Sequence, residues 1–265
     1  MNNSIIFEAV KAALAGGKAI LEVYGTEFSV DIKSDNSPLT DADRKAHNSI
    51  ATILEKTNIP ILSEEGKSIP FSERSNWKQF WLVDPLDGTK EFVKRNGEFT
   101  VNIALVDGGI PIVGVIYVPV MDILYLGVKG QGAVKVDQFA TKHFADLESV
   151  MTAGMQLPIN SGRTLYTIVG SRSHMSDETL VYVDQARAQH GEVDMISMGS
   201  SLKLCLVAEG AADVYPRFAP TMEWDTAAGQ GVALAAGCSV TQQDGITPLQ
   251  YNKENLLNPW FIVKR

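Results

Sequence analysis

The run FWLVDPLDGTKEF, residues 80 to 92, constrains the fold more strongly than any other stretch, because a hydrophobic strand pattern leads directly into two carboxylates. Asp84 and Asp87 stand three positions apart with Pro85 between them. Proline fixes its own φ and restricts the residue before it, so the backbone turns stiffly and the two carboxylates can point at a common centre. The pattern predicts a metal site.

The residues that follow suit an anion beside that metal. Gly88 lets the chain approach a ligand closely, and the next amides can donate to an anion if a helix begins at Thr89 or Lys90. Because aspartate, proline and glycine are also common in surface turns, an ordinary turn is the alternative interpretation. A metal site that faces a phosphate is the leading hypothesis.

Composition and charge bound the classes of function. With 45% hydrophobic and 20% charged residues, the 265-residue chain is ordinary globular material, long enough for one large domain or two intimate halves. We divide it into an α+β metal-binding half, 1–150, and an α/β half, 151–265, that completes the active site and binds substrate. The formal charge of -8, without a basic cluster, argues against nucleic-acid polymers as partners. An anionic substrate would therefore need a mediating cation.

Cysteine content and hydropathy bound the compartment. Only Cys205 and Cys238 occur, so we expect two buried thiols and no disulfide framework, and neither cysteine has an arginine six positions later as the cysteine phosphatases require. No apolar stretch approaches the roughly 20 residues that span a bilayer, and the N-terminus lacks the basic start of a secretory signal. We expect a cytoplasmic protein and leave open its attachment to the cytoplasmic face of the inner membrane.

The first part of the chain predicts two helices and a short strand. Apolar residues at helical spacing predict a helix over residues 4–24 that ends at Gly25. Thr40, followed by acidic residues, is a typical cap for a second helix over residues 41–57. The segment IPIL reads as a buried strand that delivers Glu64 at its C-terminal end.

The rest of the chain changes from strands to an alternating pattern. From Gln79 onward, short apolar runs separated by turn signals predict an antiparallel meander. Residues 137 to 163 carry the weakest pattern, and we expect them to form a connector. Strands and helices then alternate, which favours a sheet covered by helices. The predicted helices of this half lie near residues 176 to 189 and in the runs SSLKLCLVAEG and WDTAAGQGVALAAG.

Acidic residues lie at the ends of several of these elements. Their oxygens suit a hard divalent cation, above all Mg²⁺, whereas zinc would favour histidine and cysteine, and the four histidines are too scattered to form such a site. Without a cation, converging carboxylates would repel one another and raise one another's pKa. The acidic residues at these positions are Asp43, Glu64, Asp84, Asp87 and Asp225.

The strings LSEEG, VDPLDGTKEF and WDTAAG occur in this order, and together they resemble one enzyme family. The chain is similar to the lithium-sensitive, Mg²⁺-dependent phosphatases that include inositol monophosphatase, fructose-1,6-bisphosphatase and the 3'(2'),5'-bisphosphate nucleotidases. The longer strings DPLDGTKEFVKRNGEFTVNIALV, GSRSHM and GSSLKLCLVAEGAADVYPRF resemble the bacterial CysQ branch of the nucleotidases most. The resemblance implies a layered αβαβα sandwich, with an α+β first half and an α/β second half.

The resemblance also implies how the metals are held. Glu64, Asp84 and the backbone carbonyl of Leu86 would bind one Mg²⁺, and Asp84, Asp87 and Asp225 would bind a second, with Asp84 bridging the two. A third, loosely held Mg²⁺ near Glu64 is a further implication. Two ions at such a site can clamp both the attacking and the leaving oxygen of an in-line displacement.

Catalytic roles follow from the same resemblance. Asp43 and Thr89, with Glu64, would orient or deprotonate the nucleophilic water, and Gly88 and Thr89 would donate backbone hydrogen bonds to the scissile phosphate. Each assignment has a purely structural alternative: Asp43 can favour its own helix dipole, and Thr89 can act as a helix cap only. Asp225 can likewise be a helix cap, and Glu65 beside Glu64 is more readily a solvated or supporting carboxylate than a ligand.

The run GSSLKLCLVAEG bears on the choice of substrate. Ser200 and Ser201 at a helix start, with Lys203 in the first turn, would form a second anion site, although Lys203 could equally be a solvated lysine. His174 and Arg217 are candidates for base or phosphate contacts. The full set of predicted substrate contacts is Glu64, Leu86, Asp87, Gly88, Thr89, His174, Ser200, Ser201, Lys203, Arg217 and Asp225.

The leading functional hypothesis is hydrolysis of a phosphate monoester by metal-activated water. The resemblance implies adenosine 3',5'-bisphosphate, the by-product of sulfate activation, as the small-molecule substrate, and AMP and phosphate as products. A phospho-enzyme is not expected, because Lys45 replaces the Thr or Val of the haloacid-dehalogenase motif in DADRK. An inositol monophosphatase-like activity and a non-catalytic scaffold that binds metal or nucleotide are the alternatives. The preference between 3',5' and 2',5' substrates and the oligomeric state stay open.

Overall fold

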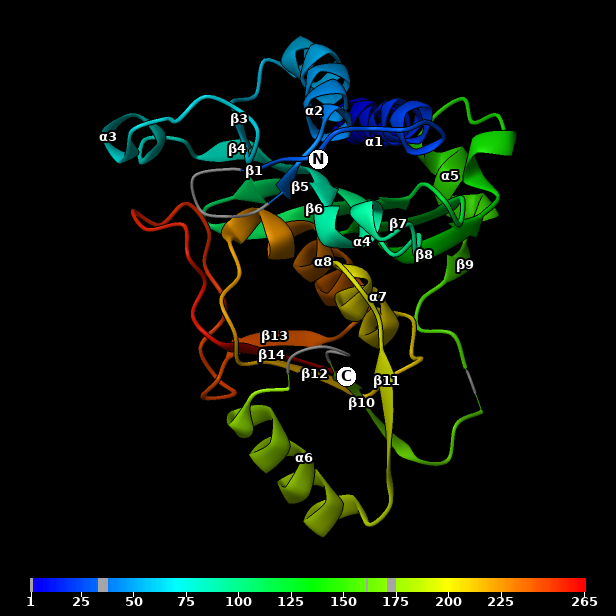
Figure 1. The fold of residues 1–265 in the computed structure, drawn as a ribbon, viewed down its shortest axis with the longest axis vertical. Coiled ribbons are helices and arrows are strands. Elements are labelled where there is room, and N and C mark those ends of the chain that lie inside the picture. The colour runs from blue at the N-terminus through cyan, green and yellow to red at the C-terminus, as the bar shows by residue number, and fades with distance from the viewer. Residues whose placement is uncertain (1, 33–37, 161, 171–174) are drawn as a thin grey trace.

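The structure is a computed structural model, and it describes residues 2–32, 38–160, 162–170 and 175–265. Two sheets and the helices around them form five layers, in the order helix, sheet, helix, sheet, helix (Figure 1). This arrangement confirms the αβαβα sandwich expected from the sequence.

The larger sheet has seven strands in simple sequence order, which confirms the predicted meander. The first two strands run parallel to each other, and every later neighbour is antiparallel. The strands are β3 (Ile61–Ser63), β4 (Gln79–Asp87), β5 (Thr100–Asp107), β6 (Ile110–Val118), β7 (Ile123–Val128), β8 (Gly132–Asp137) and β9 (Met155–Gln156).

The segment 137–163, which was expected to form a connector, links the two sheets but contains regular structure that was not predicted. Helix α5 (Leu147–Ala153) lies in this segment, and β9 returns to pair with β8 at the edge of the sheet. The Asp146 side chain accepts a hydrogen bond from the Ser149 amide at 2.9 Å and caps α5. Two helical turns and a two-residue strand are too short for hydrophobic periodicity to reveal.

The smaller sheet has five strands in the order β11–β10–β12–β14–β13. Strands β10, β11 and β12 are parallel, whereas β14 is antiparallel to both of its neighbours. Strand β14, the last strand in the sequence, is absent from the sequence-based prediction. The strands are β10 (Tyr166–Gly170), β11 (Val193–Ser197), β12 (Val214–Arg217), β13 (Ser239–Gln242) and β14 (Phe261–Lys264).

Three groups of helices complete the layers (Figure 1). Helices α1 and α2, with α5, cover the outer face of the large sheet, α7 and α8 fill the space between the sheets, and α6 covers the outer face of the small sheet. The helix predicted over residues 41–57 ends at Leu54 and continues as one 3₁₀ turn. The helices are α1 (Asn3–Tyr24), α2 (Asp41–Leu54), α6 (Asp177–His190), α7 (Leu202–Ala208) and α8 (Glu223–Ala235).

Short elements connect these layers: β1 (Asp31–Ile32), β2 (Pro38–Leu39), α3 (Phe71–Arg74), α4 (Thr89–Val93) and the 3₁₀ turns at Glu55–Thr57 and Phe139–Thr141. Cys205 and Cys238 are both free and buried, as expected. Within the described parts of the chain, every helix is too short or too polar to cross a membrane.

Helix α8 packs against the large sheet with its backbone almost in contact with the strands. A Cβ atom on Gly114 of β6 would lie 2.1 Å from the carbonyl oxygen of Ala228, so the space is available only because residue 114 is glycine. Strand β7 offers a similar close approach at Gly127. The position of α8 relative to β4 and β5 is therefore set by backbone packing, and α8 carries Asp225.

Candidate functional site

Glu64 and Asp84 lie side by side because β3 and β4 are parallel and in register. Ser63 pairs with Val83, and the Glu64 amide donates to the Val83 carbonyl at 3.1 Å, so the next residue of each strand emerges at the same end. The prediction that the two aspartates of the opening motif follow the strand is wrong, because Asp84 lies within β4 and Asp87 is its last residue. A bulge between Asp84 and Asp87 accommodates the intervening proline, which has no N–H to donate.

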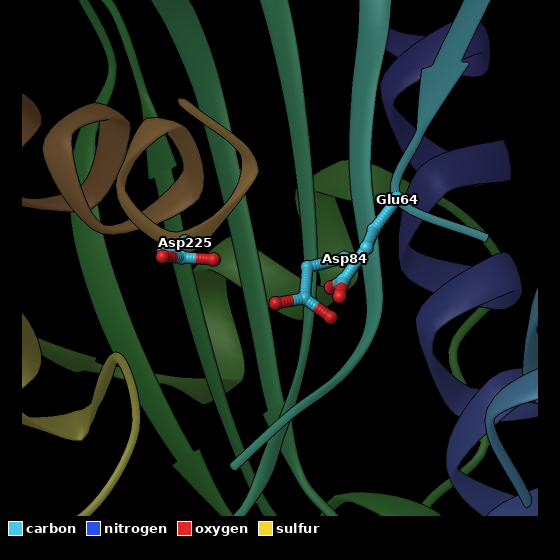
Figure 2. A group of neighbouring side chains, drawn as sticks. All are labelled: Glu64, Asp84 and Asp225. Atoms are coloured by element: carbon cyan, nitrogen blue, oxygen red, sulfur yellow. The ribbon is translucent and has the colours of Figure 1, made fainter. Parts of the chain in front are cut away.

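Three carboxylates from distant parts of the sequence converge at this end of β4. Glu64, Asp84 and Asp225 each offer an oxygen, and these oxygens lie within 4.8 Å of one another (Figure 2). Asp84 is only 2% exposed, whereas the other two side chains are partly buried. Three of the five acidic residues singled out in the sequence are thus brought together, Glu64 directly after β3, Asp84 in β4 and Asp225 in α8.

Burial and mutual repulsion make two of these carboxyls, those of Asp84 and Asp225, reluctant to ionise. Burial, followed by the charges of neighbouring carboxylates such as Glu64, holds the pKa of Asp84 well above its ordinary range. Burial and then Asp87 raise the pKa of Asp225 to about 8. A divalent cation among these oxygens would compensate both effects, and an all-oxygen donor set suits Mg²⁺. The residues present therefore fit the cation that the sequence predicts.

The contacts of Asp43 are compatible with both of its predicted roles, a helix cap and a residue of the site. One carboxylate oxygen accepts hydrogen bonds from the Thr40 amide at 2.8 Å and the Thr40 hydroxyl at 2.7 Å, which caps α2. The other oxygen accepts from the Thr89 hydroxyl at 3.2 Å. Asp225 behaves similarly, because it accepts from the Met222 amide at 2.8 Å and also belongs to the acidic group.

The turn after Asp84 begins a short helix, as predicted. Gly88 has φ 92°, a backbone conformation that residues with a side chain rarely adopt, and α4 begins at Thr89. The Leu86 carbonyl accepts from the Thr89 hydroxyl at 3.4 Å, and the Leu86 amide donates to Asp84 at 3.0 Å. These contacts hold the predicted ligand carbonyl and the predicted water-orienting hydroxyl next to each other.

Asp87 lies beside the acidic group, but its carboxylate is engaged elsewhere. Its Oδ2 accepts hydrogen bonds from the Ser200 hydroxyl and the Ser201 amide, both at 2.6 Å, and at longer range from Asn102. Among the described residues, the group of oxygens within 4.8 Å does not include Asp87. The Ser201 amide, predicted as an anion donor, is thus directed at a carboxylate of the other half.

A pocket of about 240 Å³ opens next to the acidic group and contains two cationic side chains. Lys203 lies in its wall, 5.9 Å from the centre of the Tyr215 ring, and donates to the Met198 carbonyl at 3.3 Å. Burial lowers the pKa of Lys203. Arg217 lies on the neighbouring strand β12. The pocket is lined by Asp87, Gly88, Glu91, Ser200, Ser201, Lys203, Leu204, Tyr215, Arg217, Thr221, Asp225, Thr226 and Phe261.

Sequence reasoning missed several of these lining residues. Glu91 lies inside the opening motif, Tyr215 lies two positions before Arg217 on the same strand, and Thr226 directly follows Asp225, so each stands beside a predicted residue. Thr221, between β12 and α8, and Phe261, in β14, reach the pocket only through tertiary packing, which no local pattern indicates. The predicted contact His174 lies outside the described residues.

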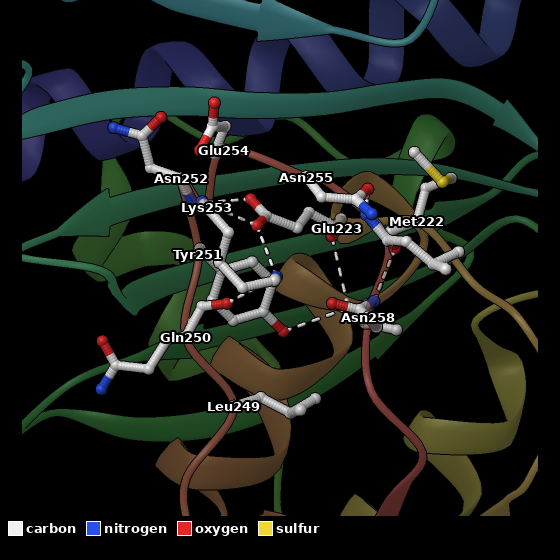
Figure 3. Close-up of polar contacts among 12 residues, drawn as sticks. Met222, Glu223, Leu249, Gln250, Tyr251, Asn252, Lys253, Glu254, Asn255 and Asn258 are labelled. Atoms are coloured by element: carbon white, nitrogen blue, oxygen red, sulfur yellow. Dashed lines mark hydrogen bonds and ion pairs between the residues drawn. The ribbon is translucent and has the colours of Figure 1, made fainter. Parts of the chain in front are cut away.

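The N-terminus of α8 is anchored by a buried carboxylate that the sequence did not reveal (Figure 3). Glu223 is 0% exposed and accepts from the Asn252 amide at 2.6 Å, from the Lys253 amide at 3.0 Å and from the Lys253 ammonium group at 2.6 Å. From the other side, Arg74 donates to the carbonyls of Lys253 and Glu254 at 2.6 and 2.8 Å. These contacts of Glu223, Lys253 and Arg74 form a clamp that fixes the first turn of α8, which bears Asp225.

Known proteins resemble this chain over its whole length. The sequence model of the inositol monophosphatase family matches residues 1–260. The 3'(2'),5'-bisphosphate nucleotidase CysQ of Escherichia coli (strain K12) is 44% identical over 261 residues, which cover 97% of this chain and 98% of the relative. The protein of the same name from Haemophilus influenzae is 33% identical over 267 residues, covering 99% and 93% of the two chains.

Solved structures give the same result. The crystal structure of CysQ from Bacteroides thetaiotaomicron, a bacterial member of the inositol monophosphatase family, is 52% identical with a TM-score of 0.92 and covers 99% of this chain and 97% of that one. The extragenic suppressor protein suhB from Bartonella henselae is 26% identical with a TM-score of 0.74, covering 98% and 93%.

Proposed function

The chain belongs to the inositol monophosphatase family, and on that premise we propose that it is a 3'(2'),5'-bisphosphate nucleotidase, a phosphomonoesterase that converts adenosine 3',5'-bisphosphate to AMP and phosphate. One observation carries the proposal. Asp225 of the acidic group also lines a pocket whose wall contains Lys203 and Arg217. A substrate with two phosphates matches a site that offers both a place for a cation and two basic side chains.

The proposal assigns the metal ligands as the family resemblance does. Glu64, Asp84 and the Leu86 carbonyl would hold one Mg²⁺, and Asp84, Asp87 and Asp225 a second, with a third near Glu64 as a weaker site. When bound, Mg²⁺ polarises the phosphoryl oxygens and makes a water molecule more acidic. The clustered oxygens and the raised pKa of Asp84 support this assignment.

The residues of the chain itself would move the proton and position the phosphate. The Thr89 hydroxyl, held by Asp43, would orient the attacking water, and Asp43 Oδ1, with Glu64 nearby, would take the proton that the water loses. The bond between phosphorus and the 3' oxygen breaks as the new bond to the water oxygen forms. The leaving oxygen takes up a proton to become the 3' hydroxyl. The amides of Gly88 and Thr89 would donate to the phosphoryl oxygens.

The second phosphate would bind between Lys203 and Arg217, with Ser200 and Ser201 at its edge. An anion there would restore the charge that burial makes unfavourable on Lys203. The contact assigned to His174 stays a prediction.

Phosphate release from a panel of substrates tests the proposal. With Mg²⁺ we expect turnover of adenosine 3',5'-bisphosphate to exceed that of inositol 1-phosphate, and chelation by EDTA to abolish it. Lys203→Met should lower kcat/KM for the bisphosphate by about 10-fold or more, the effect of losing a charged hydrogen bond, and leave inositol 1-phosphate nearly unaffected. Faster turnover of inositol phosphate would favour the monophosphatase alternative. Calorimetric binding of nucleotide without phosphate release would favour the scaffold.

A further inference from the structure

Two polar side chains of β5 are completely buried yet do not line the pocket. Thr100 is 0% exposed and Asn102 is 1% exposed, and both point from the large sheet toward the segment that precedes α7. Burying a hydroxyl and an amide in the core is costly unless each finds partners. The side-chain partners of this pair, apart from each other, are Ser200, Ser201 and Asp87.

Some of the hydrogen bonds in this cluster have a definite direction. A carboxylate oxygen can only accept, so the Ser200 hydroxyl donates to Asp87 at 2.6 Å. The Ser201 hydroxyl donates to the Asn102 side-chain oxygen at 2.8 Å. The Thr100 hydroxyl lies 2.6 Å from the Ser200 hydroxyl and 3.0 Å from the Asn102 side-chain oxygen, and its single proton can go to either one. A continuous line of short polar contacts thus runs from Thr100 through Ser200 to Asp87.

The turn that these contacts hold, residues 199–201, has a conformation that needs support. Ser200 has φ 56°, a left-handed value that residues with side chains seldom adopt. Gly199 donates to the Glu98 carboxylate at 2.8 Å, and a Cβ atom at position 199 would lie 2.8 Å from the Glu98 carbonyl oxygen. The turn is therefore pressed against the other half of the molecule, where β5 supplies the hydrogen bonds that keep it there.

The 199–201 turn connects the two ends of the site. Ser200 and Ser201 contact Asp87 next to the acidic group, and Lys203 follows two residues later in the pocket wall. We propose that Thr100 and Asn102 are positioning residues that set the distance from the acidic group to Lys203 and thereby select substrates with a second phosphate. This inference rests on the proposed function and adds a specificity determinant outside the pocket.

Thr100→Val tests the inference, because valine has nearly the same shape and lacks the hydroxyl. We expect kcat/KM for adenosine 3',5'-bisphosphate to fall about 10-fold more than kcat/KM for inositol 1-phosphate, the effect of one buried hydrogen bond. Thr100→Ser keeps a hydroxyl and should restore the wild-type ratio of kcat/KM for the bisphosphate to kcat/KM for inositol 1-phosphate. Thr167→Val is the matched control, since Thr167 is likewise buried on a strand, β10, and does not line the pocket. It should leave the ratio unchanged.

Binding of AMP in the presence of EDTA gives a second readout that needs neither turnover nor metal. Isothermal titration should show weaker binding by about 10-fold for Thr100→Val, and wild-type affinity for Thr100→Ser and Thr167→Val. If Thr100→Val does not fold, Asn102→Leu should produce the same pattern. Equal losses for both substrates, or an equal change of the ratio in Thr167→Val, would overturn the inference. A wild-type enzyme without activity on the bisphosphate would instead refute the proposed function.

Discussion

At the scale of single residues, two carboxylates of this site support the fold in a way that leaves an oxygen for the proposed chemistry. Asp43 caps α2 with one oxygen and holds the Thr89 hydroxyl with the other. Asp225 caps α8 through the Met222 amide while it faces Asp84. A helix cap needs only one carboxylate oxygen, so the cap interpretation and the site interpretation of such residues do not exclude each other.

The raised pKa of Asp225 predicts how the free energy of unfolding depends on pH when no metal is present. Its pKa is about 8 in the folded chain against an ordinary value of 3.8, so the folded state holds the proton more tightly than the unfolded state. Its contribution to stability is therefore full below the ordinary pKa and is lost as pH rises toward about 8. Asp225→Asn introduces a side chain that does not ionise, so it should remove this loss of stability at higher pH.

Thermal unfolding in EDTA between pH 5 and pH 8 measures this effect. The Tm of the wild type should fall relative to that of Asp225→Asn by at least a few degrees, since about 1 kcal/mol corresponds to about 2–4 °C in a chain of this size. Saturating Mg²⁺ should close or reverse the gap, because the cation replaces the proton. A gap that is constant over this pH range would contradict the account.

At the scale of elements, short-range signals located most helices and strands, and long-range packing decided the others. α2 begins at its predicted cap Thr40, and α4 begins at Thr89 as predicted, because capping and turn conformation depend on adjacent residues. Strand β14 and helix α5 were missed, since such short elements take their stability from the elements that they pack against rather than from a pattern of their own. The clamp that Glu223 and Lys253 form at the N-terminus of α8 was missed for the same reason.

Lys253→Met tests the clamp at the N-terminus of α8. Removing the ammonium group leaves the Glu223 carboxylate buried without its ion pair, which we expect to cost about 3 kcal/mol of stability and to weaken Mg²⁺ binding by loosening Asp225. Lys135→Met is the matched control, because Lys135 pairs with Glu209 at 2.8 Å in a second partly buried ion pair.

The two variants should lose stability to a similar extent, but only Lys253→Met should weaken Mg²⁺ binding. Chemical unfolding gives the first quantity and calorimetric titration with Mg²⁺ the second. Comparable weakening of Mg²⁺ binding in Lys135→Met would show that general destabilisation, rather than the clamp, controls the metal site.

At the scale of the whole molecule, the site exists because two sheets share one helical layer. Glu64 directly follows β3 and Asp84 lies in β4 of the large sheet, whereas Asp225 belongs to α8, which lies between the sheets (Figure 1). The distance between them is set by how closely α8 approaches β6 and β7. Small residues at that contact are thus a requirement of the metal site as well as of packing.

Gly114→Ala tests this dependence. The added methyl group would lie 2.1 Å from the Ala228 carbonyl oxygen, so α8 must move away from the sheet. We expect a loss of about 1–3 kcal/mol in the free energy of unfolding and weaker Mg²⁺ binding by titration. At Gly25 a Cβ atom would meet its nearest neighbour at 3.6 Å, so Gly25→Ala should change neither quantity. Unaltered Mg²⁺ affinity in Gly114→Ala would contradict the role of this contact.

The sequence by itself determined the acidic motif, which depends on adjacent residues, and, through its resemblance to one enzyme family, it implied the layered fold. Asp84, Gly88 and Thr89 could be interpreted from one 13-residue run. Only the tertiary structure decided that Asp87 binds the 199–201 turn and that Glu223 anchors α8. Those contacts join residues about 30 to more than 100 positions apart, and such pairs meet only after the backbone layers have packed.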